Sequence, residues 1–309
     1  MGRHNGEMQV DTPLRQLLFA TCLVQTGNTA GTAFVWNALS GDNQVPVLIT
    51  NKHVVSQPGA GSFSLAAGDG AGGVRLGERI DFAHGHFGSL WVGHPETDVD
   101  LSATFLGPFI NSAVSQGKAV FWRSVSEDIC PTDDVVERDL DAIEPVVFVG
   151  YPNALFDKKN LTPITRRGHT ATPIGLDYDG RPCFLIDASV FPGSSGSPVF
   201  IYNDSGYRAG GTFHLGATRI LFVGVLGAVH VQKDVGSIIT VTSPRVEVNQ
   251  LMDLGIVYNW RAVRETVRAL FAARGIPYGA TPPPMDVVAD VDITAQDEAP
   301  ARPDGTATT

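Results

Sequence analysis

Short apolar segments bounded by turn residues recur through most of the chain. Residues 31–36 (GTAFVW), 46–50 (PVLIT) and 145–149 (PVVFV) are three of them. Runs of this length are typical of β-strands, and the 34 glycines and 20 prolines fit the many turns that such strands need. Long helical periodicity is nearly absent before residue 258. The pattern therefore predicts an all-β chain.

Two segments near the C-terminus depart from this pattern. Residues 259–274 place Val263, Val267, Leu270 and Phe271 at helical spacing before Gly275, which predicts an α-helix. Residues 276–309 contain six acids and one base and too few apolar side chains to form a core. For this last segment we expect a disordered acidic tail.

An eight-residue apolar run at 17–24 (LLFATCLV) resembles the apolar core of a secretory signal. We predict a strand instead, because the preceding residues include Glu7 and Asp11 and residues 25–28 lead into the next apolar run, as in a hairpin. No segment approaches the roughly 18 apolar residues of a membrane span. We expect no membrane partner.

The three cysteines, Cys22, Cys130 and Cys183, include no C-x-x-C pair. Secreted β-rich domains of this size often depend on several disulfides, so we expect a reducing, cytoplasmic setting. The net charge of −10 divides equally between the tail and the remaining body. Because the body has no basic stripe, we expect no nucleic-acid partner.

Three polar positions follow apolar runs in the order His, Asp, Ser. His53 comes just after the run 47–50. At the end of a buried strand, an imidazole can be held in one orientation and its pKa can stay near neutral pH. Asp98 and Asp100 are two residues apart, so strand alternation cannot choose between them. We favour Asp100, because it leads into the apolar residues Leu101 and Ala103.

The serine lies in the run 193–198 (GSSGSP), between the apolar stretches 185–191 and 199–201. Ser195 has Gly193 two residues before it and Gly196 directly after it, whereas Ser194 lacks a following glycine and Ser197 precedes a proline. A hydroxyl in such a turn can be exposed for attack on a carbonyl carbon. The backbone N–H groups of Gly193 and Ser195 would form the oxyanion hole.

Two other motifs predict no site. Residues 68–73 spell G-x-G-x-x-G, but no helix follows them, so we expect no dinucleotide cofactor. His84, His86 and His94 lack a nearby cysteine or a fitting carboxylate pattern, and we expect no metal. We therefore expect no cofactor of any kind.

The order of these residues and the segments around them resemble the trypsin-like serine peptidases of the chymotrypsin fold, especially disulfide-poor bacterial peptidase domains. The matching segments are 31–34, 49–55, 98–101, 149–153 and 191–200, and the resemblance covers roughly residues 15–275. It implies two six-stranded antiparallel β-barrels, the first in 15–115 with His53 and Asp100, the second in 116–275 with Ser195 and the C-terminal helix packed on it.

Two departures from the trypsin pattern bear on activation and specificity. Ser194 stands where secreted trypsins have the aspartate that a new N-terminus pairs with, so we expect no zymogen cleavage of that kind. Ser189 matches the base of the specificity pocket, and Val225, Leu226 and Gly227 match its wall. These residues imply a small or medium uncharged P1 residue, unless His230 reaches back to favour an acidic one.

The resemblance implies a serine endopeptidase that cleaves a protein or peptide substrate through an acyl-enzyme. His53 would act as general base, so activity should fall below about pH 6.5, the ordinary pKa of histidine. Two alternatives remain open. One is a binding or regulatory module on a peptidase scaffold, idle or activated by a partner; the other is an esterase that uses the same residues.

Overall fold

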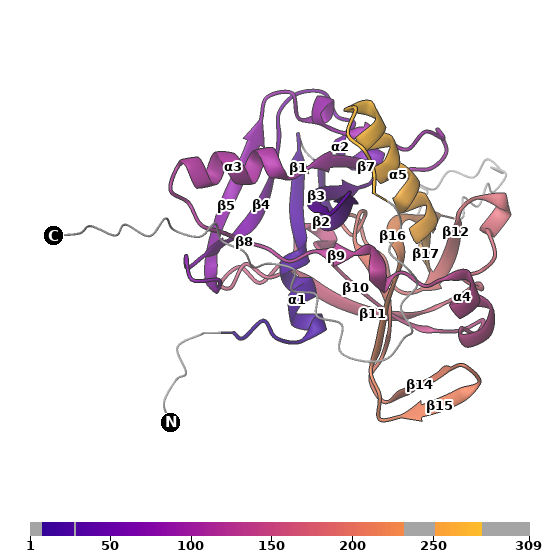
Figure 1. Ribbon diagram of the computed structural model, residues 1–309. Helices are drawn as coiled ribbons and strands as arrows, with labels where there is room; N and C mark the ends of the chain where they lie inside the picture. Colours follow the sequence, from indigo (N-terminus) through magenta and orange to yellow (C-terminus); the bar gives the residue numbers. More distant parts are fainter. Residues whose placement is uncertain (1–7, 28, 232–250, 280–309) are drawn as a thin grey trace, which may run out of the picture.

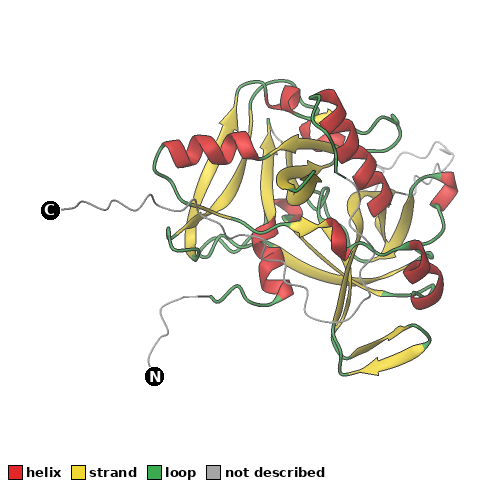
Figure 2. Cartoon of the chain, viewed as in Figure 1, coloured by secondary structure: helices red, strands yellow, loops and turns green. Residues whose placement is uncertain are grey.

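The computed structural model describes residues 8–27, 29–231 and 251–279 (Figure 1). Strands dominate these residues and form two bodies that pack against each other, with short helices around them (Figure 2). The prediction of a mostly β chain is confirmed. Among the described residues, no helix has the length and apolar character needed to cross a membrane.

The first body is a nine-stranded sheet whose main path runs β5-β4-β1-β2-β3-β7-β6. β8 pairs with β4 and β9 pairs with β2. Three of the nine strands contain only two residues each, and the β2–β9 pair is parallel. This body is therefore a nine-stranded sheet where the prediction had a six-stranded antiparallel barrel. The strands are β1 (Thr21–Thr26), β2 (Thr29–Ser40), β3 (Asn43–Thr50), β4 (Gly61–Gly68), β5 (Val74–His84), β6 (Val92–Gly93), β7 (Ser102–Phe105), β8 (Val120–Phe121) and β9 (Val125–Ser126).

The second body is a closed barrel with the strand order β10-β11-β12-β17-β16-β13, and every neighbouring pair is antiparallel. It has the predicted six strands. A separate hairpin, β14–β15, projects from it at the bottom of Figure 1. The strands are β10 (Pro145–Gly150), β11 (Ile164–Thr170), β12 (Cys183–Asp187), β13 (Pro198–Asn203), β14 (Gly206–Ala209), β15 (Thr212–Leu215), β16 (Arg219–Val231) and β17 (Leu251–Asn259).

The two bodies share an aromatic core. Phe222 on β16 packs its ring 5.6 Å from that of Phe34 and 5.3 Å from that of Trp36, measured between ring centroids, and both partners lie on β2. All three side chains are fully buried. Burial of aromatic surface on this scale is a large stabilising contribution, so it fixes the two bodies relative to each other.

The described residues form five α-helices: α1 (Pro13–Ala20), α2 (Lys52–Val55), α3 (Gly107–Ser115), α4 (Asp133–Asp139) and α5 (Trp260–Ala273). The prediction of a strand over 17–24 is wrong for its first half, because α1 extends through Ala20 and β1 starts at Thr21. Thr12 caps α1, and Pro13 occupies its first turn, where a missing N–H costs nothing. These two residues favour a helix over the predicted strand.

The predicted C-terminal helix is α5. Its N-cap is Asn259, whose side chain accepts hydrogen bonds from the backbone N–H groups of Arg261 and Ala262. The apolar face that the spacing predicted, Val263, Val267, Leu270 and Phe271, is buried. The helix packs on β16 and β17 of the barrel, as predicted, and also on β6 and β7 of the first body (Figure 1). It therefore connects the two bodies.

The domain boundaries stay a prediction. The first sheet reaches Ser126 through β8 and β9, beyond the boundary placed at residue 115, and the barrel strands run from Pro145 to Asn259. The tail predicted for 276–309 lies outside the described residues from residue 280 onward. All three cysteines are buried and free, and burial raises the pKa of the Cys22 thiol to about 12.

Candidate active site

His53 lies in the short helix α2, directly after β3. The end of β3 is fully buried, and so is Asn51, the residue that precedes α2 at its N-cap position. This rigid strand end fixes the backbone of His53, while 49% of its side chain stays exposed to solvent. An imidazole held in this way can reach a substrate without losing its orientation.

Asp100 binds His53 with both of its carboxylate oxygens. Its Oδ2 lies 2.5 Å from His53 Nδ1, and its Oδ1 accepts a hydrogen bond of 3.0 Å from the backbone N–H of His53. Asp98, the other candidate, makes no such contact among the described residues; its backbone carbonyl accepts a bond of 3.4 Å from the hydroxyl of Tyr258. Of the two aspartates, the structure brings Asp100 to the histidine.

The backbone around Asp100 is held from both bodies. Asn51 Nδ2 donates to the Asp100 carbonyl over 2.7 Å, and Lys52 Nζ donates to the Glu96 carbonyl over 2.7 Å. Burial lowers the pKa of Lys52, and the charges of Asp100 and Asp98 act in the opposite direction. Tyr258, from β17, has its pKa raised mainly by burial. These contacts hold the backbone that carries the Asp100 side chain.

Ser195 lies in a turn that only glycine permits on either side. Gly193 and Gly196 both have φ of +89°, in the left-handed region. A Cβ on Gly193 would come within 2.5 Å of the Tyr151 carbonyl oxygen, and a Cβ on Gly196 would overlap the Thr32 carbonyl oxygen. The glycines that singled out Ser195 in the sequence are therefore required by backbone conformation and by close packing.

Thr32, on β2 of the first body, binds the serine turn at two points. Its N–H donates to the Ser195 carbonyl over 2.8 Å, and its Oγ1 donates to the Gly193 carbonyl over 2.9 Å. The same Oγ1 accepts a bond of 3.0 Å from the Tyr151 N–H. Sequence reasoning missed this role: residues 31–34 matched the family pattern, but a buried threonine in a strand gives no signal of its partners.

The N–H of Gly193, a predicted oxyanion donor, faces away from the turn formed by residues 151–154. Asn153 N–H donates to the Pro192 carbonyl over 2.5 Å. In a trans peptide the C=O and the following N–H point in opposite directions, so Gly193 N–H points away from Asn153. Within the described part of the chain, neither Gly193 N–H nor Ser195 N–H donates to another group. Both donors are free to bind an oxygen.

The Ser195 hydroxyl donates to the Gly227 carbonyl oxygen over 2.8 Å. It makes no hydrogen bond to His53 in this structure, as far as the described residues go. Gly227 nevertheless lies beside the histidine segment, since a Cβ at this glycine would be 3.7 Å from Asn51 Nδ2. The structure thus joins His53 to Asp100 and holds Ser195 at the same seam, with its hydroxyl turned to Gly227.

The structure brings together only some of the residues that were predicted to form the specificity pocket. Val225 and Leu226 are fully buried, and a Cβ on Gly255 would touch both Leu226 and Val190, at 3.0 Å and 2.8 Å. Ser189 is half-buried, and no described polar group binds its hydroxyl. The side chain of His230 lies outside the described residues. The pocket and its P1 preference stay predictions.

The two motifs that predicted no site have structural roles. Residues 68–73 join β4 to β5, and the Asp69 carboxylate accepts hydrogen bonds from the N–H groups of Ala71 and Gly73, which lowers the pKa of Asp69. His86 N–H donates to His84 Nδ1 over 3.1 Å. Among the described residues, no three His, Cys, Asp or Glu side chains are grouped as metal ligands would be.

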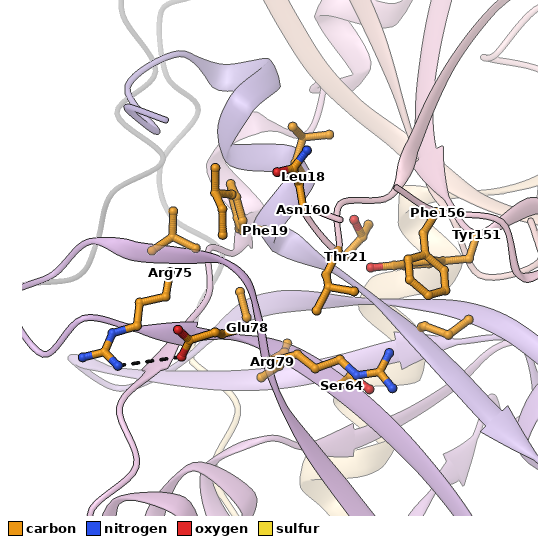
Figure 3. A pocket seen from close by; sticks show the side chains of 16 residues that line it. Leu18, Phe19, Thr21, Ser64, Arg75, Glu78, Arg79, Tyr151, Phe156 and Asn160 are labelled. Atoms are coloured by element: carbon orange, nitrogen blue, oxygen red, sulfur yellow. Dashed lines mark ion pairs between the residues drawn. The ribbon is translucent and has the colours of Figure 1, made fainter. Parts of the chain in front are cut away.

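A separate small pocket lies between α1, β1, β4, β5 and residues 151–161 (Figure 3). Arg75 and Glu78 form an ion pair of 3.7 Å at its edge. None of the predicted site residues lines it. Tyr151 does line it, and the backbone of Tyr151 also contacts Thr32 and Gly193. The pocket therefore lies next to residues that support the candidate site, but it does not include the site residues.

A closed barrel that carries a glycine-flanked serine, packed on a sheet that carries a hydrogen-bonded His–Asp pair, is the arrangement of the trypsin-like serine peptidase fold. The predicted resemblance is confirmed at the level of the fold. Tyr258, Asn51 and Thr32 are the supporting residues that the sequence did not identify.

No protein-family model and no curated protein matches this chain. Similar solved structures include the inactive form of Rv3671c from M. tuberculosis H37Rv with a serine-to-alanine mutation, at 14% identity and a TM-score of 0.41, covering 89% of this chain and 98% of that one. A thermostable serine protease, AL20, from an extremophilic microorganism is 11% identical, with a TM-score of 0.42 and coverage of 85% and 99%. The MamO protease domain from Magnetospirillum magneticum is 14% identical, with a TM-score of 0.41 and coverage of 81% and 96%.

Proposed function

We propose that this protein is a serine endopeptidase that uses His53, Asp100 and Ser195. The observation that carries the proposal is the double contact between Asp100 and His53, at 2.5 Å to Nδ1 and 3.0 Å to the backbone N–H. A carboxylate in this position holds the imidazole with its proton on Nδ1. It leaves Nε2 as the base and stabilises the imidazolium that forms.

The reaction begins when Ser195 Oγ turns from the Gly227 carbonyl toward a bound peptide. His53 Nε2 takes the hydroxyl proton as Oγ forms a bond to the scissile carbonyl carbon, and the carbonyl oxygen becomes negative. The N–H groups of Gly193 and Ser195 stabilise that oxygen; loss of one such donor costs on the order of 100-fold in rate. His53 then protonates the leaving amine, and water hydrolyses the acyl-enzyme by the same steps.

We further propose that the substrate is a protein or peptide with a small or medium uncharged P1 residue. The buried apolar side chains of Leu226 and Val190 support this preference, because an apolar wall gives no partner to a charged side chain. The three buried, unpaired cysteines support a reducing, cytoplasmic setting.

The test is labelling with a fluorophosphonate probe, which reacts with an activated serine. We expect the wild type to be labelled and Ser195→Ala to remain unlabelled. Ser194→Ala is the matched control, because this neighbouring hydroxyl is buried and has no hydrogen-bond partner among the described residues. Labelling that persists in Ser195→Ala contradicts the proposal. If Ser195 is labelled as expected, sequencing the fragments that the protein makes from a diverse peptide library would give the P1 residue.

The second candidate is a regulatory module on the same scaffold, activated by a partner. The hydrogen bond from Ser195 to Gly227 favours it, since a hydroxyl held by a carbonyl is not yet paired with its base. Absence of labelling in the isolated protein, followed by labelling after addition of a protein partner, would support this candidate. Hydrolysis of a small ester with no cleavage of any peptide would instead indicate an esterase.

A further inference from the structure

His94 lies at the start of the loop that carries the proposed catalytic aspartate. We name residues 94–101 the acid loop. His94 directly follows β6, and its side chain is only 1% exposed. Its backbone N–H donates to the Leu101 carbonyl over 2.8 Å, so the loop is closed at its two ends. Asp100 precedes the closing residue.

The two ring nitrogens of His94 have different partners, and these define its tautomer. Nδ1 lies 3.0 Å from the backbone N–H of Glu96 and therefore accepts a hydrogen bond. A neutral imidazole has one acceptor and one donor nitrogen, so the hydrogen is on Nε2. Nε2 lies 3.1 Å from Glu265 Oε2, which is the acceptor that this hydrogen needs.

Glu265 reaches the loop from α5, 171 residues further along the chain. One face of α5, with Val263 and Val267, is buried, whereas 53% of the Glu265 side chain is exposed. Because the carboxylate keeps much of its hydration, it can accept the His94 hydrogen bond without a large desolvation cost. The helix also packs on β6 and β7, which flank the acid loop.

Glu96 connects His94 to the histidine of the proposed site. Its N–H donates to His94 Nδ1, and its carbonyl accepts the bond of 2.7 Å from Lys52 Nζ. Lys52 is the residue directly before His53. The side chains of His94 and Lys52 therefore bind the backbone of the same acid-loop residue, Glu96.

We propose that His94 is a positioning residue: with its tautomer held by Glu265, it fixes Glu96 and thereby holds Asp100 against His53. This role in catalysis rests on the proposed peptidase function. The link itself, from α5 through His94 to the acid loop, does not depend on it.

Two substitutions at His94 separate the two ring contacts. His94→Asn places an amide oxygen near the Nδ1 position, where it can accept the Glu96 N–H, and loses the bond to Glu265. His94→Gln can extend an amide N–H toward Glu265 but leaves the Glu96 N–H unpaired. We expect kcat to fall on the order of 10-fold to 100-fold in His94→Gln, with KM little changed, and to fall less in His94→Asn, because loss of positioning near the chemistry has effects of this size.

Two substitutions at Glu265 test the helix end of the link without changing a buried residue. Glu265→Ala removes the acceptor and should lower kcat, whereas Glu265→Gln keeps an acceptor oxygen and should retain most of it. Arg268→Ala is the matched control, because Arg268 is exposed one turn further along α5 and its described contact is with the Tyr278 ring, away from the acid loop.

Two NMR measurements test the proposal without any turnover. We expect His94→Gln and Glu265→Ala to shift the signal of the His53 Nδ1 proton and to speed hydrogen exchange at the Glu96 amide, while amides inside α5 stay protected. If the wild type shows no labelling by fluorophosphonate but these signals change, the peptidase function fails and the positioning link stands. If labelling is normal and all four variants match the wild type in kcat and in both signals, the positioning role is wrong.

Discussion

The hydroxyl of Ser195 donates a hydrogen bond of 2.8 Å to the carbonyl oxygen of Gly227. Gly227 belongs to β16 of the barrel, and a Cβ at this position would come within 2.6 Å of the Tyr258 ring. The Tyr258 ring therefore packs closely on the backbone of Gly227. The Ser195 hydroxyl therefore has a defined partner in this structure, and the proposed function requires it to exchange that partner for His53.

The hydrogen bond between Ser195 and Gly227 predicts that the NMR signal of the Gly227 carbonyl changes when the Ser195 hydroxyl is removed. In Ser195→Ala, the Gly227 carbonyl loses its donor, so its 13C NMR signal should shift. Acylation or phosphonylation of Ser195 removes the same hydrogen and should shift the signal in the same direction. Ser194→Ala should leave it unchanged. An unchanged Gly227 signal in Ser195→Ala would show that the bond is not populated in solution.

Replacing Thr32 should loosen the serine turn. Thr32→Val removes the Oγ1 contacts to Gly193 and Tyr151, both buried, and leaves two backbone groups without a partner. We expect the free energy of unfolding to fall by about 1–3 kcal/mol. We also expect labelling of Ser195 to slow, since Gly193 is a proposed oxyanion donor.

Thr32→Ser is the control for that change, because it keeps the hydroxyl and removes only a methyl group. Chemical denaturation and the rate of fluorophosphonate labelling provide the two measurements. Equal losses in the valine and serine variants would show that packing of the methyl group, and not the hydrogen bonds, supports the turn.

The two aspartates of the acid loop should respond differently to the same substitution. Asp100→Asn replaces one acceptor oxygen with an N–H₂ group, so the side chain can no longer accept from both His53 Nδ1 and the His53 N–H. We expect kcat to fall on the order of 10⁴-fold, as for the matching change in other triads. Asp98→Asn should change it little, because the described contact of Asp98 is made by its backbone carbonyl. A larger loss in Asp98→Asn would reverse the assignment.

Two glycines with nearly equal backbone angles allow the packing of the serine turn to be measured. Gly196 has φ of +89° and Gly70 has φ of +84°, so an alanine at either position has a strain cost of roughly 1–2 kcal/mol. A Cβ at Gly70 meets open space, whereas a Cβ at Gly196 overlaps the Thr32 carbonyl. Gly196→Ala should therefore destabilise the protein more and abolish labelling. Equal unfolding midpoints for the two variants would contradict the close contact.

The buried thiol of Cys22 predicts a loss of stability at high pH. Burial raises its pKa from 9.0 to about 12, so between these values the unfolded chain releases a proton that the folded chain keeps. The contribution of Cys22 is constant below pH 9, and it lowers stability as pH rises toward 12, by up to about 1.4 kcal/mol per pH unit. Urea unfolding at a series of pH values from neutral to about 10.5 should show a steeper decline in the wild type than in Cys22→Ser. Parallel curves would contradict this prediction.

Much of the fold and the candidate site could be predicted from the sequence, because strands and turns are specified locally. The glycines at 193 and 196 are needed for positive φ and close packing, and that need is visible as a glycine pattern around Ser195. The apolar spacing of α5 likewise identifies its buried face. Local signals of this kind do not require knowledge of partners.

The supporting contacts could not be predicted, because they join residues far apart along the chain. Thr32 and Gly193 are 161 residues apart, and His94 and Glu265 are 171 apart. The strand predicted at 17–24 failed for a different reason: its apolar residues suit either structure, and the decision depended on the cap at Thr12 and the proline after it. The choice between Asp98 and Asp100 also needed the packed structure.

The link from α5 to the acid loop has a consequence for the newly made polypeptide. Glu265 is synthesised after His53, Asp100 and Ser195, so the three proposed catalytic residues precede the carboxylate that binds His94. If the proposed function holds, a nascent chain does not align these groups fully until α5 docks on the acid loop.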